Sequence, residues 1–281
     1  MTARRVVPRL RAFRHRVRLG LLAASLGGLA LAIGGFRTAL SSQGAAPDTL
    51  RVVAYNIHHG EGMDGEVDLA RIAALVTALE PDLVALQEVD RSVERTGVVD
   101  QAARLGTLTG MAVAFGAFMP HQGGDYGMAV LSRWPIVASH NHRLPDGEEP
   151  RSALAVRVRS PTTGRELVFV GIHLYRTEPE RVAQAARIAA IFATVEVPVM
   201  LAGDFNSEPG SPVLALLART WRFVEKGADR LTFPSTGPER EIDFVAYRPA
   251  DAFTVLRQQL LDEPVVSDHR PLFVELVWHE P

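Results

Sequence analysis

The residues of this chain that could carry chemistry stand at the ends of apolar, strand-like runs. Asn56 follows Val-Val-Ala-Tyr, Glu88 follows Leu-Val-Ala-Leu-Gln, and His173 follows Leu-Val-Phe-Val-Gly-Ile. Strand ends that meet at one edge of a sheet converge in space, so such side chains can form one site although they are far apart in the sequence. The candidates are Asn56, Glu88, His173, Asp204, Asn206, Asp243, Asp268 and His269.

Taken singly, most of these residues also have a structural explanation. An Asn or Asp after a strand is commonly a turn former, and a lone histidine such as His173 is often a satisfied core residue. Glu88 is different, because a carboxylate that closes a buried strand lies at a desolvated edge and needs a cation or a partner. Asp204 and Asn206 are two positions apart and point the same way from an extended segment. The set as a whole favours a functional site.

The residue types indicate chemistry with a hard cation. Carboxylate oxygens of Glu88, Asp204 and Asp268 and the amide oxygen of Asn56 suit Mg²⁺ or Mn²⁺. Zinc is disfavoured, because the chain has no cysteine and no His-x-x-x-His or HExxH spacing. Histidines beside carboxylates supply a general acid or base near neutral pH. With no Walker loop, dinucleotide fingerprint or G-x-S-x-G elbow, the pattern indicates metal-assisted attack of water on a phosphorus ester.

The elements that must position these residues follow from the hydrophobic periodicity. Helical spacing predicts helices over 67–79 and 179–195 and a shorter one over 212–218. Many strands with few helices predict an α/β (α+β) fold in which two packed mixed β-sheets are flanked by helices, in one domain over residues 49–281. The expected strands are 50–57, 82–87, 128–132, 136–144, 152–159, 166–172, 197–202, 242–247 and 272–278.

The N-terminal segment has a targeting pattern. Residues 1–18 form an Arg-rich tail, residues 19–36 are an apolar run without a charge, and residues 37–48 form a linker of mostly small residues. A run of this length is at the lower limit for a membrane-spanning helix, and a buried core helix is seldom apolar on every face. We favour an uncleaved membrane anchor over a cleaved signal segment. Both interpretations keep the arginines cytoplasmic and export the domain, so the protein is expected to be membrane-anchored on the extracytoplasmic side, or secreted if cleaved.

Charge is divided unequally along the chain. The net charge is −2, but residues 1–37 hold eight arginines and no acid, which leaves 22 basic against 32 acidic residues and a formal charge of −10 in the remainder. A domain this acidic should repel a nucleic-acid backbone, since non-specific binding depends on basic residues that neutralise phosphates. A hydrophobic content of 47% excludes a disordered chain, and the lack of cysteine excludes a disulfide scaffold.

The motifs together resemble those of the endonuclease/exonuclease/phosphatase superfamily, which includes deoxyribonuclease I, neutral sphingomyelinases and inositol-polyphosphate 5-phosphatases. The resemblance covers residues 50–278. Six short motifs stand in the order of the family: Tyr-Asn-Ile, Leu-Gln-Glu-Val, Gly-x-His-Leu, Gly-Asp-Phe-Asn, Ile-Asp-x-Val and Ser-Asp-His-x-Pro-Leu. The resemblance implies a four-layer α/β sandwich and a Mg²⁺-dependent hydrolase of phosphate esters.

The resemblance also implies a role for each residue around the cation. Asn56 and Glu88 would hold the metal, and Asp268 would assist the metal and orient the following histidine. Asp204 would position or activate the attacking water.

The remaining residues would act on the phosphoryl group. By the same resemblance, Asn206 would bind phosphate and His173 would contact the phosphoryl oxygens. His269, paired with Asp243, would be the general base or would stabilise the transition state.

Two departures from the family pattern bear on the substrate. His58 stands where exonuclease III-type members have an acid, and Asn-Ile-His-His-Gly resembles a bacterial and membrane-lipid-associated branch. The sequence also has neither a 5-phosphatase signature nor a Lys-rich groove. The substrate therefore stays open between a nucleic acid and a lipid headgroup, as cleaved by a phospholipase C-like enzyme. A non-catalytic tethered binding module is the alternative from another class, and no protein partner is predicted. The arginines near the predicted site could clamp a phosphate, but surface arginines are commonly only solvated, and none is favoured: Arg91, Arg133, Arg151, Arg176 and Arg240.

Overall fold

The computed structural model of the chain describes residues 49–279. The predicted tail (1–18), the anchor or signal segment (19–36) and the linker (37–48) lie outside the described residues. Within 49–279, no helix has both the length and the apolar character needed to cross a bilayer.

The described chain consists of twelve strands, four α-helices and two short 3₁₀ segments. The helices are α1 (Leu69–Leu79), α2 (Gln101–Thr109), α3 (Glu178–Phe192) and α4 (Pro212–Leu217), and the 3₁₀ segments are His58–Gly60 and Glu94–Thr96. The first six strands are β1 (Thr49–Asn56), β2 (Leu83–Arg91), β3 (Ala112–His121), β4 (Gly124–Ser132), β5 (Ile136–Arg143) and β6 (Ser152–Arg159). The others are β7 (Glu166–His173), β8 (Val199–Asp204), β9 (Arg222–Phe223), β10 (Asp243–Arg248), β11 (Phe253–Leu260) and β12 (Leu272–Trp278).

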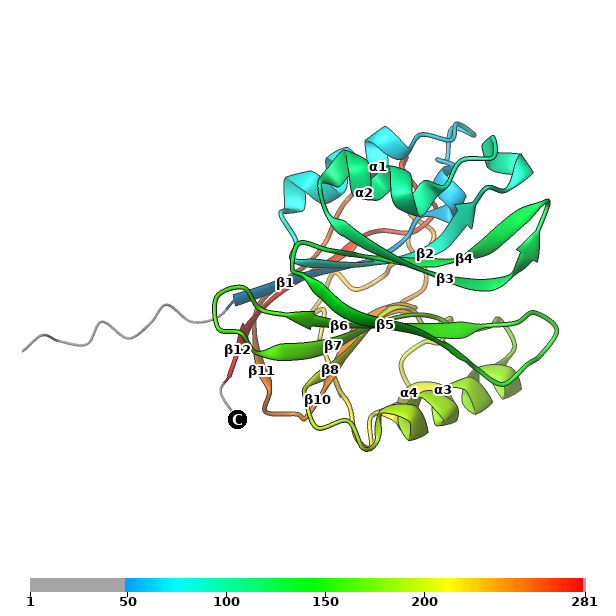
Figure 1. Cartoon of the computed structure of the whole chain (residues 1–281). Helices are drawn as coiled ribbons and strands as arrows, with labels where there is room; N and C mark the ends of the chain where they lie inside the picture. Colours follow the sequence, from blue (N-terminus) through cyan, green and yellow to red (C-terminus); the bar gives the residue numbers. More distant parts are fainter. Residues whose placement is uncertain (1–48, 280–281) are drawn as a thin grey trace, which may run out of the picture. The chain divides into compact units, whose positions relative to one another are not determined.

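These strands form two six-stranded mixed sheets. The first sheet has the order β11-β12-β1-β2-β4-β3, and the second has the order β5-β6-β7-β8-β10-β9. The pairs β1–β2 and β7–β8 are parallel, whereas the other pairs are antiparallel. The prediction of two mixed sheets flanked by helices is confirmed (Figure 1).

Alternation of side chains along the central strands explains how the layers pack. In β1, Val52 and Ala54 enter the core between the sheets, whereas Val53 and Tyr55 pack on the opposite face against α1 and α2. A third cluster joins the outer face of the second sheet to α3 and α4. Because both faces are covered, the central strands are apolar almost throughout, as the sequence of β1 indicates. The result is a helix–sheet–sheet–helix sandwich (Figure 1).

Besides the two 3₁₀ segments, one helix and three strands are not in the set predicted from the sequence: α2, β3, β9 and β11. The sequence of α2 contains Gly106 and three threonines or glutamines, so its helical signal is weak. Close packing explains why a glycine stands at position 106, because a Cβ there would lie 2.3 Å from the side chain of Val113 on β3. Strand β11 is an edge strand whose outward side chains are mostly exposed. Propensity alone does not reveal such elements, since tertiary contacts stabilise them.

Candidate active site

The predicted site residues meet where the ends of two parallel strand pairs face each other. In the first sheet, Asn56 at the end of β1 is aligned with Gln87 of β2. In the second sheet, His173 at the end of β7 is aligned with Asp204 at the end of β8. Asp204 is also aligned with Asp243, the first residue of the antiparallel strand β10. Parallel pairing thus carries side chains from both sheets to one end of the sandwich.

A bulge in β2 turns Glu88 towards the site. Gln87 is paired with Met128 and Val89 with Gly127, so Glu88 is an extra residue in the ladder. Its φ is 59°, a left-handed value that non-glycine residues rarely adopt. Bulges of this kind re-aim a side chain, and strained backbone persists where the surrounding structure holds it. Asn206 and His58 also have left-handed φ values, of 47° and 46°.

Asn56 connects the carboxylates of the two sheets. Its Nδ2 donates a hydrogen bond to Glu88 Oε1 at 3.0 Å and to Asp204 Oδ2 at 3.4 Å, and it lies 3.4 Å from His269 Nε2. The backbone N–H of His58 donates to Asn56 Oδ1 at 3.1 Å. In this orientation the amide oxygen, which the sequence analysis assigned to the metal, points to the backbone. Metal ligation by that oxygen would require the amide to be turned over.

His269 forms a buried pair with Asp243. Its Nδ1 lies 2.8 Å from Asp243 Oδ2, and its Nε2 lies 3.8 Å from Asp204 Oδ2. Burial by itself would lower the pKa of His269, but the carboxylates of Asp243, Asp204 and Asp268 outweigh it and raise that pKa to about 10. The imidazole is therefore protonated at neutral pH and offers Nε2–H as a donor.

The pKa values of Asp204 and His173 are both shifted in the direction that favours the neutral side chain. Burial raises the pKa of Asp204 to about 7, and the nearby Asp243 carboxylate adds to this shift. Burial also lowers the pKa of His173 well below its usual value, and Arg151 and His269 act in the same direction. His173 Nε2 lies 3.5 Å from Asp204 Oδ2. Strongly perturbed groups that share a buried contact are typical of functional sites.

Asn206 and Asp268 stand at the margins of this network. The backbone N–H of Asn206 donates to Asp204 Oδ1 at 2.7 Å, and its side-chain amide donates to Leu174 O at 2.9 Å. The half-buried Asp268 accepts from the Ser267 hydroxyl at 3.3 Å, and the same hydroxyl donates to the Asn56 carbonyl at 2.7 Å. The structure thus brings all eight predicted residues together. Ser267, which links β1 to the residues before β12, is an additional contact that the sequence analysis did not identify.

A cavity of about 350 Å³ opens directly beside these residues. Glu88, His173 and Asn206 form one part of its wall. The sequence did not indicate that the other lining residues form one wall, although Arg151 and Arg176 are among the arginines considered as phosphate clamps. The remaining lining residues are Arg95, Met119, His121, Tyr126, Glu149, Arg151, Tyr175 and Arg176.

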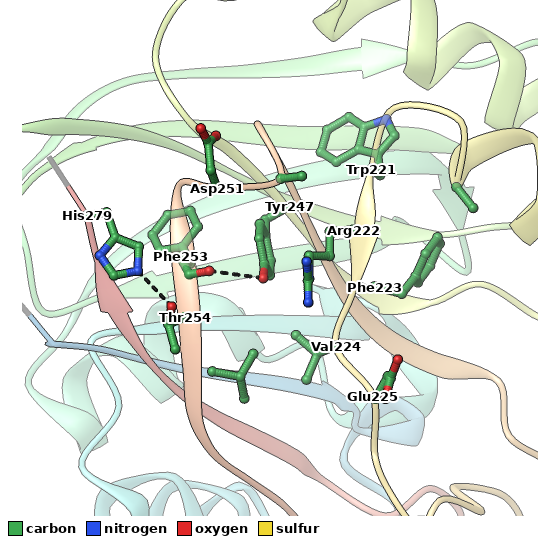
Figure 2. Close-up of a pocket in the computed structure, with 13 residues that line it drawn as sticks. Trp221, Arg222, Phe223, Val224, Glu225, Tyr247, Asp251, Phe253, Thr254 and His279 are labelled. Atoms are coloured by element: carbon green, nitrogen blue, oxygen red, sulfur yellow. Dashed lines mark hydrogen bonds between the residues drawn. The ribbon is translucent and has the colours of Figure 1, made fainter. Parts of the chain in front are cut away.

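A larger cavity of about 960 Å³ lies elsewhere, between the edge strands β9 and β11 (Figure 2). Trp221, Tyr247 and Phe253 form its inner wall, and the Tyr247 hydroxyl donates to Phe253 O at 3.2 Å. None of the eight predicted residues lines this cavity. Size therefore does not identify the site here, whereas convergent, perturbed polar groups do.

The buried donor atoms of the site suit a divalent cation with oxygen ligands. Side-chain atoms of Asp204, Asp243 and His269 all lie within 4.8 Å of one another. Asp243 Oδ1 is buried and has no hydrogen-bond partner among the described residues. The protonated His269 offsets the charge of Asp243, so the surplus of negative charge comes from the nearby carboxylates of Glu88 and Asp268 together with Asp204, and it fits a hard cation with oxygen ligands.

Comparison with known proteins points to one family. The model of the Endonuclease/Exonuclease/phosphatase family matches residues 53–269. "Uncharacterized protein YbhP" of Escherichia coli is 28% identical over 243 residues, which are 81% of this chain and 96% of that protein.

Solved structures have the same fold. An endonuclease/exonuclease/phosphatase from Beutenbergia cavernae superposes with a TM-score of 0.66 at 28% identity, over 82% of this chain and 72% of that chain. A mannosyl-6-phosphatase from Bacteroides thetaiotaomicron superposes with a TM-score of 0.68 at 20% identity, over 82% of this chain and 100% of that chain.

Proposed function

The chain belongs to the endonuclease/exonuclease/phosphatase family, whose members act on phosphate esters, and from this premise we propose that it is a Mg²⁺-dependent phosphoric ester hydrolase. One observation supports the proposal most strongly. The protonated His269, the buried Asp204 and the bulge residue Glu88 all contact Asn56 or one another within 3.8 Å, and Glu88 lines the adjoining cavity. Four groups of a hydrolytic site are thus held in one network.

The cation would be held by oxygen ligands. Glu88 is a half-buried carboxylate that lines the cavity and accepts from Asn56, and Asp268 and a turned Asn56 amide would complete the set. Once bound, Mg²⁺, or Mn²⁺ in its place, would polarise the phosphoryl oxygens. In the orientation described above, Asn56 Nδ2 donates to both Glu88 and Asp204, and turning the amide would exchange these hydrogen bonds for ligation of the cation.

The protein groups divide the proton chemistry among themselves. Asp204, with a pKa near neutrality, is suited to orient the attacking water and accept its proton at a carboxylate oxygen. The protonated His269 donates from Nε2 to a phosphoryl oxygen, and Asp243 holds its ring from the other side. This division favours transition-state stabilisation over the general-base role for His269. The neutral His173 donates a further hydrogen bond, and Asn206 binds phosphate.

Substitution of two residues tests the proposal. Glu88→Gln removes a charge that holds the cation, and His269→Ala removes the charged donor, so each should lower kcat/KM by about 10²–10⁴-fold. The measurement is the hydrolysis of an aryl phosphate ester in Mg²⁺, with and without EDTA. Asp251→Asn, an exposed residue away from the site, serves as the control and should retain full activity. Full activity of both site variants would contradict the proposal.

Calorimetry separates the hydrolase from a non-catalytic binding module. We expect Mg²⁺ at millimolar concentration to bind the intact protein and Glu88→Gln to weaken that binding. Protein that neither binds Mg²⁺ nor cleaves the ester would be such a module. The named substrate of the Bacteroides neighbour does not decide the substrate here, because 20% identity shows only a common fold.

A further inference from the structure

The wall of the catalytic cavity contains three arginines that lie against aromatic rings. The guanidinium of Arg151 lies 4.8 Å from the ring centre of Phe118 and 5.4 Å from that of Tyr175. Arg95 lies 5.3 Å from the ring of Tyr126, and Arg176 lies 5.8 Å from the ring of Tyr175. Contact with an aromatic ring restricts the direction of the guanidinium N–H groups. Arg95 and Arg151 are therefore oriented donors, whereas the Arg176 side chain is more exposed.

Each of these arginines already has a carboxylate partner. Arg95 donates two hydrogen bonds of 2.8 Å to the buried Asp90. Arg151 donates to Glu149, and the Arg176 guanidinium lies 3.9 Å from Glu148. The three guanidinium groups therefore lie among four carboxylates, namely their three partners and Glu88.

This composition argues against two classes of substrate. A nucleic-acid strand needs an unpaired positive groove along its backbone, and here the positive charges are matched by carboxylates. An acyl chain needs an apolar wall, and Met119 is the only aliphatic residue among those that line the cavity. The volume of about 350 Å³ is near the lower end of the range of roughly 300–1,000 Å³ for small-molecule sites. The cavity therefore suits a compact polar group.

Paired guanidinium and carboxylate groups are complementary to hydroxyl groups. A hydroxyl both donates and accepts a hydrogen bond, so vicinal hydroxyls on a ring can accept from an arginine and donate to its glutamate. Resting on the proposed hydrolase function, we infer that the substrate is a phosphate ester of a polyhydroxylated ring, either a free sugar or cyclitol phosphate or the inositol headgroup of a lipid. The ring occupies the cavity beside Arg176 and Glu149. Water attacks phosphorus and gives a proton to Asp204, and the bond between phosphorus and the ester oxygen of the polyol breaks. That oxygen takes up a proton from solvent as the free polyol leaves, and the phosphoryl group remains as inorganic phosphate or, from the lipid, as the lipid phosphate.

Substrate competition tests this inference on the intact protein in Mg²⁺. We expect kcat/KM for a hexose 6-phosphate or an inositol 1-phosphate to exceed that for p-nitrophenyl phosphate and for a single-stranded oligonucleotide by at least about tenfold. Hydrolysis of phosphatidylinositol in vesicles, with little hydrolysis of the free phosphates, would identify the lipid as the source of the same ring. An oligonucleotide or the aryl ester cleaved as well as every polyol ester would overturn the inference.

A variant connects the preference to the wall. Arg176→Ala removes one exposed donor and should lower the ratio of polyol to aryl kcat/KM by about tenfold. Arg219→Ala, an exposed arginine after α4, is the matched control and should leave the ratio unchanged. An unchanged ratio in Arg176→Ala would also overturn the inference. Failure of the hydrolase function itself would look different, because then no ester, including the aryl ester, would be cleaved.

Discussion

The two histidines of the site have opposite titration behaviour because their neighbours differ. His269 faces three carboxylates, which raise its pKa to about 10 in spite of burial. Burial lowers the pKa of His173 well below its usual value, with Arg151 as a further cause. When two like groups have different pKa values, they can take different roles in one reaction. The His269 imidazole is therefore a charged donor, and the His173 imidazole is a neutral one.

Asp204 makes the reaction depend on pH. Its pKa of about 7 means that the carboxyl becomes protonated as the pH falls, and a protonated carboxyl cannot accept the proton of the attacking water. We therefore expect kcat for the aryl ester to fall as the pH is lowered through about 7. His269 keeps its proton up to about 10, so no matching loss is expected on the alkaline side at pH 8 or 9. A pH–rate profile that stays level from pH 5 to 8 would contradict this assignment.

Residue identities at the site follow from the sequence, but orientations do not. Asn56, Glu88 and Asp204 could be named because each ends an apolar run. The sequence does not show that the Asn56 amide oxygen accepts from a backbone N–H, since this depends on the turn at His58. It does not show the position of Arg151 either, because the rings around it come from β3, from β4 and from the residues after β7.

At the level of elements, close approach to β7 in the same sheet and to Gln87 in the other sheet sets the geometry of β8. Gly203 precedes Asp204, has a φ of 144°, and a Cβ there would lie 2.1 Å from Ile172 O and 2.8 Å from Gln87 Nε2. Gln87 is a fully buried residue of the other sheet. The glycine therefore permits the second sheet to approach the first where both contribute to the site.

Gly203→Ala should lower stability and activity together. The new methyl group meets backbone and cannot be relieved by a side-chain rotation, so we expect the free energy of unfolding to fall by about 1–3 kcal/mol. Urea denaturation followed by fluorescence measures the change, and the aryl ester assay measures the activity. Gly237→Ala is the matched control, because nothing lies within 4 Å of a Cβ at Gly237. Equal stability of the two variants would show that the site tolerates displacement of β8.

Strongly periodic elements could be predicted, and those that depend on partners could not. The predicted helix over 67–79 corresponds to α1, which begins after Asp68, whose side chain accepts from the backbone N–H groups of Ala70 and Arg71. Strand β3, with small residues and a proline, has little intrinsic strand signal. Its pairing with β4 and its contact with the second sheet stabilise it instead.

At the level of the whole molecule, the charge of the domain agrees better with a small substrate than with a long nucleic acid. The −10 carried by the chain after residue 37 includes the carboxylates of the site and those that pair with the arginines of the cavity. Part of the negative charge of the domain therefore belongs to the site and its cavity.

We propose that the domain is exported, and fractionation of cells tests this. We expect the full-length chain in the membrane fraction, or a shortened chain outside the cell if the segment over 19–36 is removed. Immunoblotting of each fraction, with N-terminal sequencing of the recovered protein, distinguishes these two results. Full-length protein recovered from the cytoplasm without membranes would contradict both.

The direction of β1 has a practical consequence. The strand begins at Thr49, next to Val277 of β12, and ends at Asn56, so its two ends are about 23 Å apart at roughly 3.3 Å per residue. Thr49 is therefore at the end of the strand that is remote from Asn56 and the site. A solid support or a fusion partner coupled at residue 49 should leave the entrance for substrate unobstructed.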